Sequence, residues 1–145
     1  MPTTGSHIPL EFQIDGAVSS LLGGLRELES QPDLMALAHL VVDACRRELG
    51  VRAVTLAINP ETAGLLDPGW TGRRVRRLAS HRGQDPAWDH DSDGWCAPTG
   101  SQPFNWGGGA IPDAGLFCAN EEAQGWIRLQ VAAAGRTALL LTLEW

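Results

Sequence analysis

Hydrophobic positions recur at helical spacing along residues 33–49 and then change to the alternation of a strand. The apolar positions of the first part lie on one face of a helix: Leu34, Leu37, Val41, Ala44, Cys45 and Leu49. Asp33 suits a first helical turn, and Gly50 suits the left-handed residue that ends a helix. Residues 53–58 alternate between larger and smaller side chains, which predicts a buried strand that stops at Asn59-Pro60.

The end of the chain has the pattern of a β-hairpin. Three apolar residues, Ile127, Leu129 and Val131, alternate with Trp126, Arg128 and Gln130. Residues 137–145 then form a nearly continuous apolar run, which is typical of a strand in the middle of a sheet. The turn of the hairpin is expected around Ala134-Gly135-Arg136.

Residues 14–28 carry a second helical stripe, formed by Ile14, Val18, Leu21, Leu22, Leu25 and Leu28. This stripe suits either packing on its own domain or pairing with a second copy in a homodimer, and the sequence leaves both open. Residues 1–12 are expected to be a disordered or loose arm that precedes a single domain of residues 13–145.

The middle of the chain is less regular. Residues 73–82 predict a strand, whose arginines are interpreted as a solvated strand edge or as a site for a phosphate or a partner. Residues 83–94 read as an acidic turn region, residues 99–106 hold a short strand, and residues 107–109 are expected to be a flexible connection. The whole order predicts an α+β fold, with a central antiparallel sheet of about five strands and the N-terminal helices packed on one face.

Charge and composition narrow the class of protein. The formal net charge of −6 argues against general nucleic-acid binding. The sequence contains no apolar stretch of the roughly 20 residues that span a bilayer, and its N-terminus has no export pattern. Three cysteines in 145 residues do not suggest a disulfide scaffold, so we expect a cytoplasmic protein without a membrane partner.

Three stretches of the sequence resemble a GAF domain. Residues 33–58, including the G-V-R-A-V-T-L run of residues 50–56, resemble the opening helix and first strand of that family. Residues 93–100 with Pro103 resemble its mid-domain G-W-V-A-x-T-G-x-P pattern, and residues 130–144 resemble its closing hairpin. The resemblance covers roughly residues 14–145. It implies a PAS-like sensor fold that binds a small molecule between its sheet and its loops, often as a dimer.

The tryptophans are the first candidates for a ligand site. The chain has six tryptophans and no tyrosine, and Trp70, Trp88, Trp95 and Trp106 fall in its loop-rich half. Large flat rings suit either a ligand pocket or the packing of loops onto the sheet, and these two interpretations are compatible. The expected ligand-binding residues are Trp88, Trp95, Cys96, Trp106, Cys118 and Trp126.

Two cysteines suggest an alternative, enzymatic function. Gly94-Trp95-Cys96 resembles a stretch of the free methionine-(R)-sulfoxide reductases, a branch of GAF proteins, and Cys118 resembles the position of their nucleophile. The resemblance implies thiol-dependent reduction of a sulfoxide, with Cys96 resolving the product as a disulfide. Of the acidic substrate ligands of that branch, Glu144 alone has a counterpart here. Both cysteines are otherwise small buried hydrophobic residues.

Cofactor and metal motifs are weak. Residues 89–94 begin like a calcium-binding loop, but Gly100 stands where the closing glutamate belongs. We therefore expect no cofactor and no metal. The sequence predicts a binding module for a small molecule or a partner protein, without catalysis of its own, and the reductase is the alternative.

Overall fold

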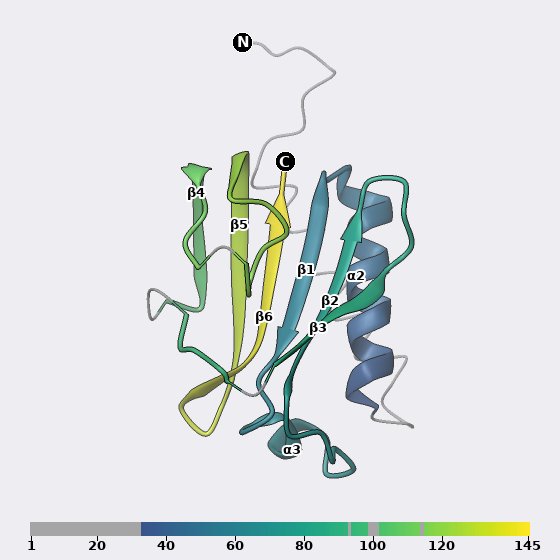
Figure 1. Ribbon diagram of the computed structural model, residues 1–145, viewed down its shortest axis with the longest axis vertical. Helices are drawn as coiled ribbons and strands as arrows, with labels where there is room; N and C mark the ends of the chain where they lie inside the picture. Colours follow the sequence, from purple (N-terminus) through teal and green to yellow (C-terminus); the bar gives the residue numbers. More distant parts are fainter. Residues whose placement is uncertain (1–32, 93, 99–101, 114) are drawn as a thin grey trace.

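The computed structural model describes residues 33–92, 94–98, 102–113 and 115–145. In this part of the chain six antiparallel strands form one sheet in the order β3-β2-β1-β6-β5-β4, with two helices beside it (Figure 1). The elements are α2 (Leu34–Leu49), β1 (Ala53–Ile58), α3 (Ala63–Leu66), β2 (Val75–His81), β3 (Ala87–Ser92), β4 (Phe104–Ala110), β5 (Glu122–Ala133) and β6 (Arg136–Glu144). The predicted α+β class and antiparallel sheet are confirmed, whereas the sheet has six strands where about five were expected.

The helix and the strand predicted for residues 33–58 are both present. Asp33 caps α2, because its side chain accepts hydrogen bonds from two backbone N–H groups of the first turn. Gly50 ends the helix in the left-handed conformation, with φ of 61°. All residues of β1 are buried, as expected for a strand between two neighbours with both faces covered.

The C-terminal hairpin also forms as predicted. Ala134 and Gly135 connect β5 to β6, and both have positive φ, at 53° and 76°. Two successive residues of positive φ are typical of the tight turns whose twist matches a pair of antiparallel strands. β6 lies between β1 and β5, which explains why its sequence is apolar almost throughout.

The two edge strands were not predicted in full. The acidic region of residues 83–94 contains β3, and the glycines at 107–109, expected as a flexible connection, lie inside β4. An edge strand has one neighbour and a solvent-facing side, so it needs no apolar alternation. Because β3 forms the edge of the sheet, β2 is an interior strand. The interpretation of Arg76 and Arg77 as part of a solvated strand edge is therefore wrong.

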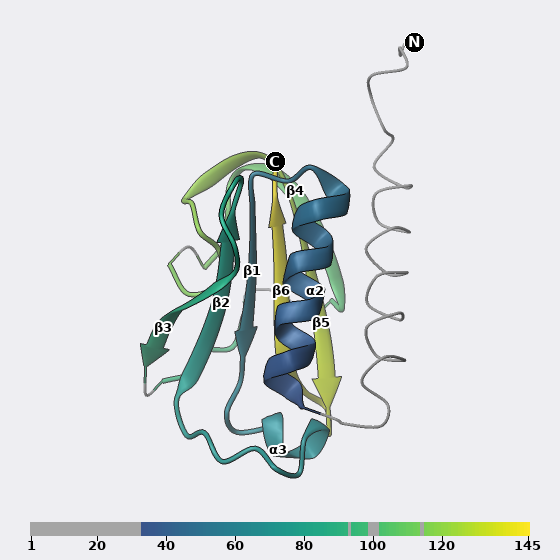
Figure 2. The same ribbon diagram turned by 90° about the vertical axis from the view of Figure 1, so that its right-hand side faces the viewer.

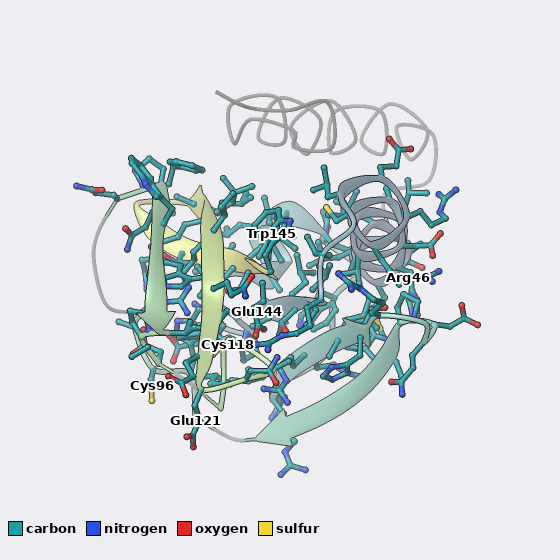
Figure 3. The ribbon with its side chains drawn as sticks, turned by 90° about the horizontal axis from the view of Figure 1, so that it is seen from above. Arg46, Cys96, Cys118, Glu121, Glu144 and Trp145 are labelled. Atoms are coloured by element: carbon teal, nitrogen blue, oxygen red, sulfur yellow. The ribbon has the colours of Figure 1, made fainter. Side chains whose placement is uncertain are left out.

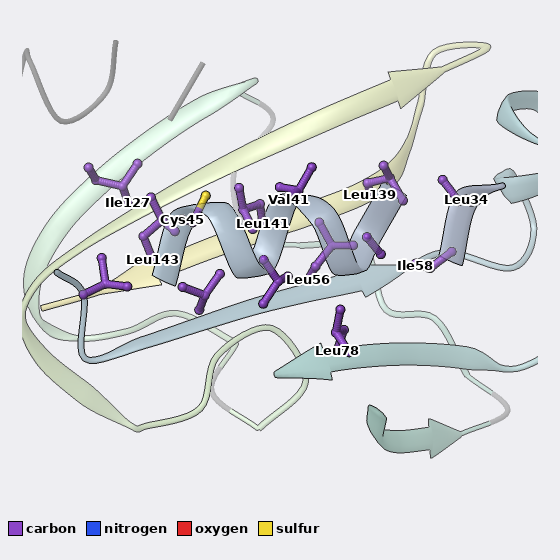
Figure 4. Close-up of a cluster of buried hydrophobic side chains, with 14 of the residues drawn as sticks. Leu34, Val41, Cys45, Leu56, Ile58, Leu78, Ile127, Leu139, Leu141 and Leu143 are labelled. Carbon is purple, nitrogen blue, oxygen red and sulfur yellow. The ribbon is translucent and has the colours of Figure 1, made fainter. Parts of the chain in front are cut away.

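The main hydrophobic core lies between α2 and one face of the sheet. α2 packs against β1 and β2 on this face (Figure 2). The helix contributes Leu34, Ala38, Val41, Val42 and Cys45, and the strands contribute alternate residues: Val54, Leu56, Ile58, Leu78, Ile127, Leu139, Leu141 and Leu143 (Figure 4). Burying each large apolar side chain contributes about 1.5–3 kcal/mol, so this layer provides most of the driving force for folding.

One helix covers this face in the described part of the chain, where a group of helices was expected. The short helix α3 contacts β6 at one end of the sheet. The predicted arm of residues 1–12, the stripe of residues 14–28 and the dimer that would use this stripe lie outside the described residues. Among the helices described, none has the length and apolar character needed to cross a membrane.

Glycines in β4 let the large ring of Trp126 lie across the neighbouring strand. Gly107 pairs with Trp126, and a Cβ atom on Gly107 would lie 2.9 Å from the Trp126 ring. A Cβ atom on Gly108 would lie 2.8 Å from the backbone oxygen of Gln124. Glycine is therefore required at these positions for close approach of β4 and β5.

We predict that Gly108→Ala lowers the free energy of unfolding by about 1–3 kcal/mol, because the backbone of β4 or β5 must shift to admit the methyl group. Urea unfolding followed by circular dichroism measures this. Gly125→Ala is the matched control in β5, since its added methyl group would meet its nearest neighbour, the Gly107 oxygen, at 4.0 Å. Equal unfolding midpoints for the two variants would contradict the close-approach argument.

Candidate functional site

The sheet face opposite α2 bears a row of polar residues that crosses four strands. The strand register places Thr55 of β1, Thr142 of β6, Arg128 of β5 and Asn105 of β4 opposite one another. Thr55, Thr142 and Arg128 are each 0% exposed. Buried polar groups need hydrogen-bond partners, so the segment that covers this row must supply them.

The covering loop, residues 111–121 without Ala114, lies over this row and binds Arg128. The Nη2 group of Arg128 donates a hydrogen bond to the backbone oxygen of Pro112 at 2.7 Å. Its Nη1 group contacts a carboxylate oxygen of Asp113 at 3.4 Å, and its Nε group donates to Thr142 Oγ1 at 3.3 Å. One guanidinium group thus joins the covering loop to two strands of the sheet.

Two aromatic rings flank the same guanidinium group. Its central carbon lies 5.8 Å from the ring centroid of Phe117 and 5.6 Å from that of Trp126, which are cation–π distances. Burial lowers the pKa of Arg128, and the negative charge of Asp113 partly offsets this by raising the pKa. The guanidinium group keeps its charge at neutral pH. Two buried polar atoms nearby in the sheet, Thr55 Oγ1 and Trp126 Nε1, have no hydrogen-bond partner among the described residues.

Glu144 holds the other end of the covering loop. This carboxylate is 0% exposed, and it accepts hydrogen bonds from the backbone N–H of Ala119 and from the side-chain amide of Asn120, both at 2.8 Å. Arg52 lies 3.9 Å from the same carboxylate. Two buried charges of opposite sign therefore fix the covering loop to the sheet at its beginning and its end.

The two predicted reactive cysteines lie in different environments. Cys118 belongs to the covering loop and is buried, and this burial raises the pKa of its thiol. Cys96 is exposed, and Figure 3 shows it at the periphery of the molecule, while Cys118 lies close to Glu144. Cys45, on the core side of α2, has its thiol pKa raised to about 12 by burial. The three cysteines form no disulfide.

A cleft of about 450 Å³ opens beside the covering loop, on the same side of the sheet. It is lined by Asn59, Glu61, Trp95, Ala97, Pro98, Gln130, Gly135, Arg136 and Thr137. The Trp95 ring packs on Phe117 of the covering loop at a centroid distance of 5.1 Å, and both belong to a cluster with Ala57 and Leu140 of the sheet. The contact with Phe117 therefore fixes the position of the Trp95 ring in the cleft.

The polar lining residues of the cleft are connected with one another. Thr137 donates its hydroxyl hydrogen to Gln130 Oε1 at 2.8 Å, and its backbone oxygen accepts from Asn59 Nδ2 at 2.8 Å. Glu61 and Arg136 form an ion pair at the mouth. Apolar side chains together with a small number of positioned polar groups are the usual lining of a small-molecule site.

The other predicted ligand-binding tryptophans lie away from this cleft. Trp88 packs on the α2 side of the sheet. The centroid of its ring lies 5.7 Å from that of the His39 ring and 5.1 Å from Cζ of Arg76. Trp106 is 57% exposed on β4 and contacts Phe104, while Trp126 is buried beside Arg128. Of the predicted site residues, the structure thus places Trp95 alone in the cleft, and it does not gather the others around it.

Sequence reasoning missed the polar wall and Arg128. Arg128 lies on the face of β5 opposite its alternating apolar residues, and residues on such a face usually contact solvent. The sequence of the strand therefore gives no indication that Arg128 is buried. Arg136 is far in sequence from Asn59 and Glu61, and the pairing of β1 with β6 brings the two segments together. The opposite charges of Glu61 and Arg136 indicate a contact between the two residues only once that strand pairing is known.

Comparisons of this chain with protein-family models, with curated proteins and with solved structures gave no match.

We predict that iodoacetamide alkylates Cys96 first, and Cys45 and Cys118 at least about tenfold more slowly. Exposed Cys96 meets the reagent directly, whereas the other two thiols are buried and their raised pKa values reduce the reactive thiolate. Intact mass spectrometry over a time course at pH 8 measures this order. The urea-unfolded chain serves as control and should react at all three sites at similar rates. Equal rates for Cys96 and Cys118 in the native protein would contradict the burial of Cys118.

Proposed function

We propose that this chain is a GAF-like regulatory module that binds a small molecule in the cleft beside Trp95 and has no catalysis of its own. The observation that carries this proposal is the cleft of about 450 Å³, with one aromatic wall and one polar wall. Pockets of about 300–1,000 Å³ with this composition hold ligands of metabolite size.

The rigidity of the cleft supports binding. Trp95 rests on Phe117, and the covering loop that carries Phe117 is attached to the sheet through Arg128 and Glu144. A wall that is already in place loses little conformational entropy when a ligand arrives. The cleft is thus preorganised for binding.

The arrangement of layers supports the GAF-like part of the proposal. An antiparallel sheet carries a helix on one face and loops on the other, and the cleft lies on the loop side. This is the side on which the sequence resemblance implied a ligand. The regulatory role follows from that resemblance.

A screen with a matched pair of variants tests the proposal. We expect a compound that stabilises the wild-type protein in a broad thermal-shift screen to lose its effect on Trp95→Ala, because the apolar wall is removed. Trp106→Ala is the control, since this tryptophan is 57% exposed on β4 and does not line the cleft. A ligand at a hundredfold excess over its dissociation constant adds about 2.7 kcal/mol to the free energy of unfolding.

Two outcomes would overturn the proposal. One is a screen in which no compound stabilises the wild-type protein. The other is a set of stabilising compounds whose effects are the same on Trp95→Ala and on wild type, since their binding would then lie elsewhere.

The reductase alternative has less support. A nucleophilic thiol needs a lowered pKa and access to its substrate, whereas Cys118 is buried and its thiol pKa is raised by that burial. Glu144, the carboxylate that the reductase resemblance assigns to substrate, is occupied by the N–H of Ala119 and the amide of Asn120. We therefore favour binding without catalysis.

We predict that the wild-type protein and Cys118→Ser reduce free methionine-(R)-sulfoxide at the same background rate in the presence of dithiothreitol. Amino-acid analysis of the methionine formed measures this rate. Thiol-dependent turnover by the wild type that disappears in Cys118→Ser, while persisting in Cys45→Ser, would establish the reductase in place of the binding module.

A further inference from the structure

We infer that residues 14–28 of this chain pack as an amphipathic helix in an apolar groove beside α2, on the sheet face opposite the covering loop. The groove lies between the flank of α2 that is turned away from β3 and the strands β5 and β4. This inference is independent of the Trp95 cleft, which lies on the other side of the sheet. It selects the first of the two interpretations of the stripe of residues 14–28, packing on its own domain.

α2 is packed on one half of the sheet. Of the described helices, α2 packs mainly on β1 and β2, and α3 contacts the end of β6. Figures 1 and 3 show α2 beside β2, with β4 and β5 at the opposite end of the sheet. The apolar surface on the α2 side nevertheless continues across β5 and β4.

The strands β5 and β4 present apolar side chains to the α2 side. Ile127, Leu129 and Val131 lie on this side of β5, and the last two are partly exposed. The register places Phe104 of β4 opposite Leu129, and Trp106 opposite Ile127, and residues opposite one another point to the same face. The rings of Phe104 and Trp106 have centroids 5.1 Å apart, and Trp106 is 57% exposed. A continuous apolar surface of this kind is typical of a docking site.

The two flanks of α2 differ in character. His39 and Arg46 lie on one flank, where they contact β3 and the turn before it. Because successive helical residues are 100° apart, Leu37 and Ala44 lie on the opposite flank, with Leu40 beside them. The flank toward β3 is therefore occupied by contacts with that strand and its turn, whereas the flank toward β5 is apolar.

Residues 14–28 match this groove in pattern and in reach. Their stripe of apolar residues, from Ile14 to Leu28, lies on one side of a helix. Residues 29–33 separate this stripe from Leu34, the first residue of α2, and five residues reach at most about 17 Å. Packed helices have axes about 8–10 Å apart and are commonly joined by about 2–8 residues. The segment can therefore lie antiparallel to α2 and bury its stripe in the groove.

The short connection also favours the segment of the same chain over that of a second copy. A segment tethered by a short linker meets its site at an effective concentration on the order of millimolar, which exceeds the concentration of a second copy in dilute solution. Gly16, Gly23 and Gly24 make residues 14–28 a weak helix in isolation, because glycine is a poor helix former. The helical structure of this segment therefore depends on burial of its stripe.

Hydrogen exchange of the full chain, followed by two-dimensional NMR, tests the docking. We expect the amide protons of residues 18–28 to exchange at least about tenfold more slowly than in the urea-unfolded chain. Trp106→Asp places a charge in the groove and should remove this protection. Leu65→Asp is the control, since Leu65 is 61% exposed on α3 and lies outside the groove, and it should leave the protection unchanged.

A substitution in the stripe tests the same contact from the segment. Leu21→Asp should lower the urea midpoint of the chain and shift the amide signals of Phe104, Trp106 and Leu129, because the segment leaves the groove. Ser19→Asp is the matched control, since residue 19 lies on the other side of the same helix, and it should do neither.

Light scattering identifies which copy supplies the segment. A monomeric wild-type protein with the expected protection supports docking within one chain. A dimer that dissociates in both Leu21→Asp and Trp106→Asp would overturn the inference in favour of a second copy. Residues 18–28 that exchange as in the unfolded chain, or equally in the wild type and in Trp106→Asp, would overturn it as well, since the segment would then not occupy the groove.

Discussion

The buried positive charge of Arg128 is the constraint on which the loop side of this protein depends. A guanidinium group that is 0% exposed must find its partners within the protein. It finds them in the backbone of Pro112 and the carboxylate of Asp113, and this brings the covering loop onto the sheet. Phe117 then lies over the guanidinium group and supports Trp95, so the position of Trp95 in the cleft depends in part on this buried cation.

The two faces of the sheet are stabilised by different kinds of contact. The α2 face is filled by apolar side chains that need no directional contacts. A cavity left by truncating one of them lowers the free energy of unfolding by several kcal/mol. The opposite face includes buried charges, and Thr55 Oγ1 and Trp126 Nε1 find no partner in the described part of the chain, each at a cost of about 1–3 kcal/mol. The apolar layer offsets this cost, which allows the other face to keep its buried polar groups.

The sequence was most informative where one periodicity covers a whole element. The helix from Leu34, the strand from Ala53 and the turn at Ala134-Gly135 follow from local spacing and local backbone requirements. The edge strand β4 was missed because Gly107 and Gly108 are required by contacts with β5, at the ring of Trp126 and at the backbone of Gln124, and a local pattern does not show contacts between strands. For the cleft, a tryptophan signals apolar surface but not which face of the sheet it occupies, and Trp88 lies on the opposite face from Trp95. The polar wall depends on strand pairing, which local patterns do not specify.

The attachment of the covering loop also bears on where the proposed ligand would enter. Reaching the space around Cys118 requires the loop to leave the sheet, which breaks the hydrogen bonds of Pro112 with Arg128 and of Ala119 and Asn120 with Glu144. Each such bond to a charged group contributes about 1.5–3 kcal/mol, and the ring of Phe117 would be exposed as well. The Trp95 cleft requires no such opening, because it lies at the edge of the loop. The contacts that enclose the thiol of Cys118 therefore favour the Trp95 cleft over the space beneath the loop as the site of the proposed ligand.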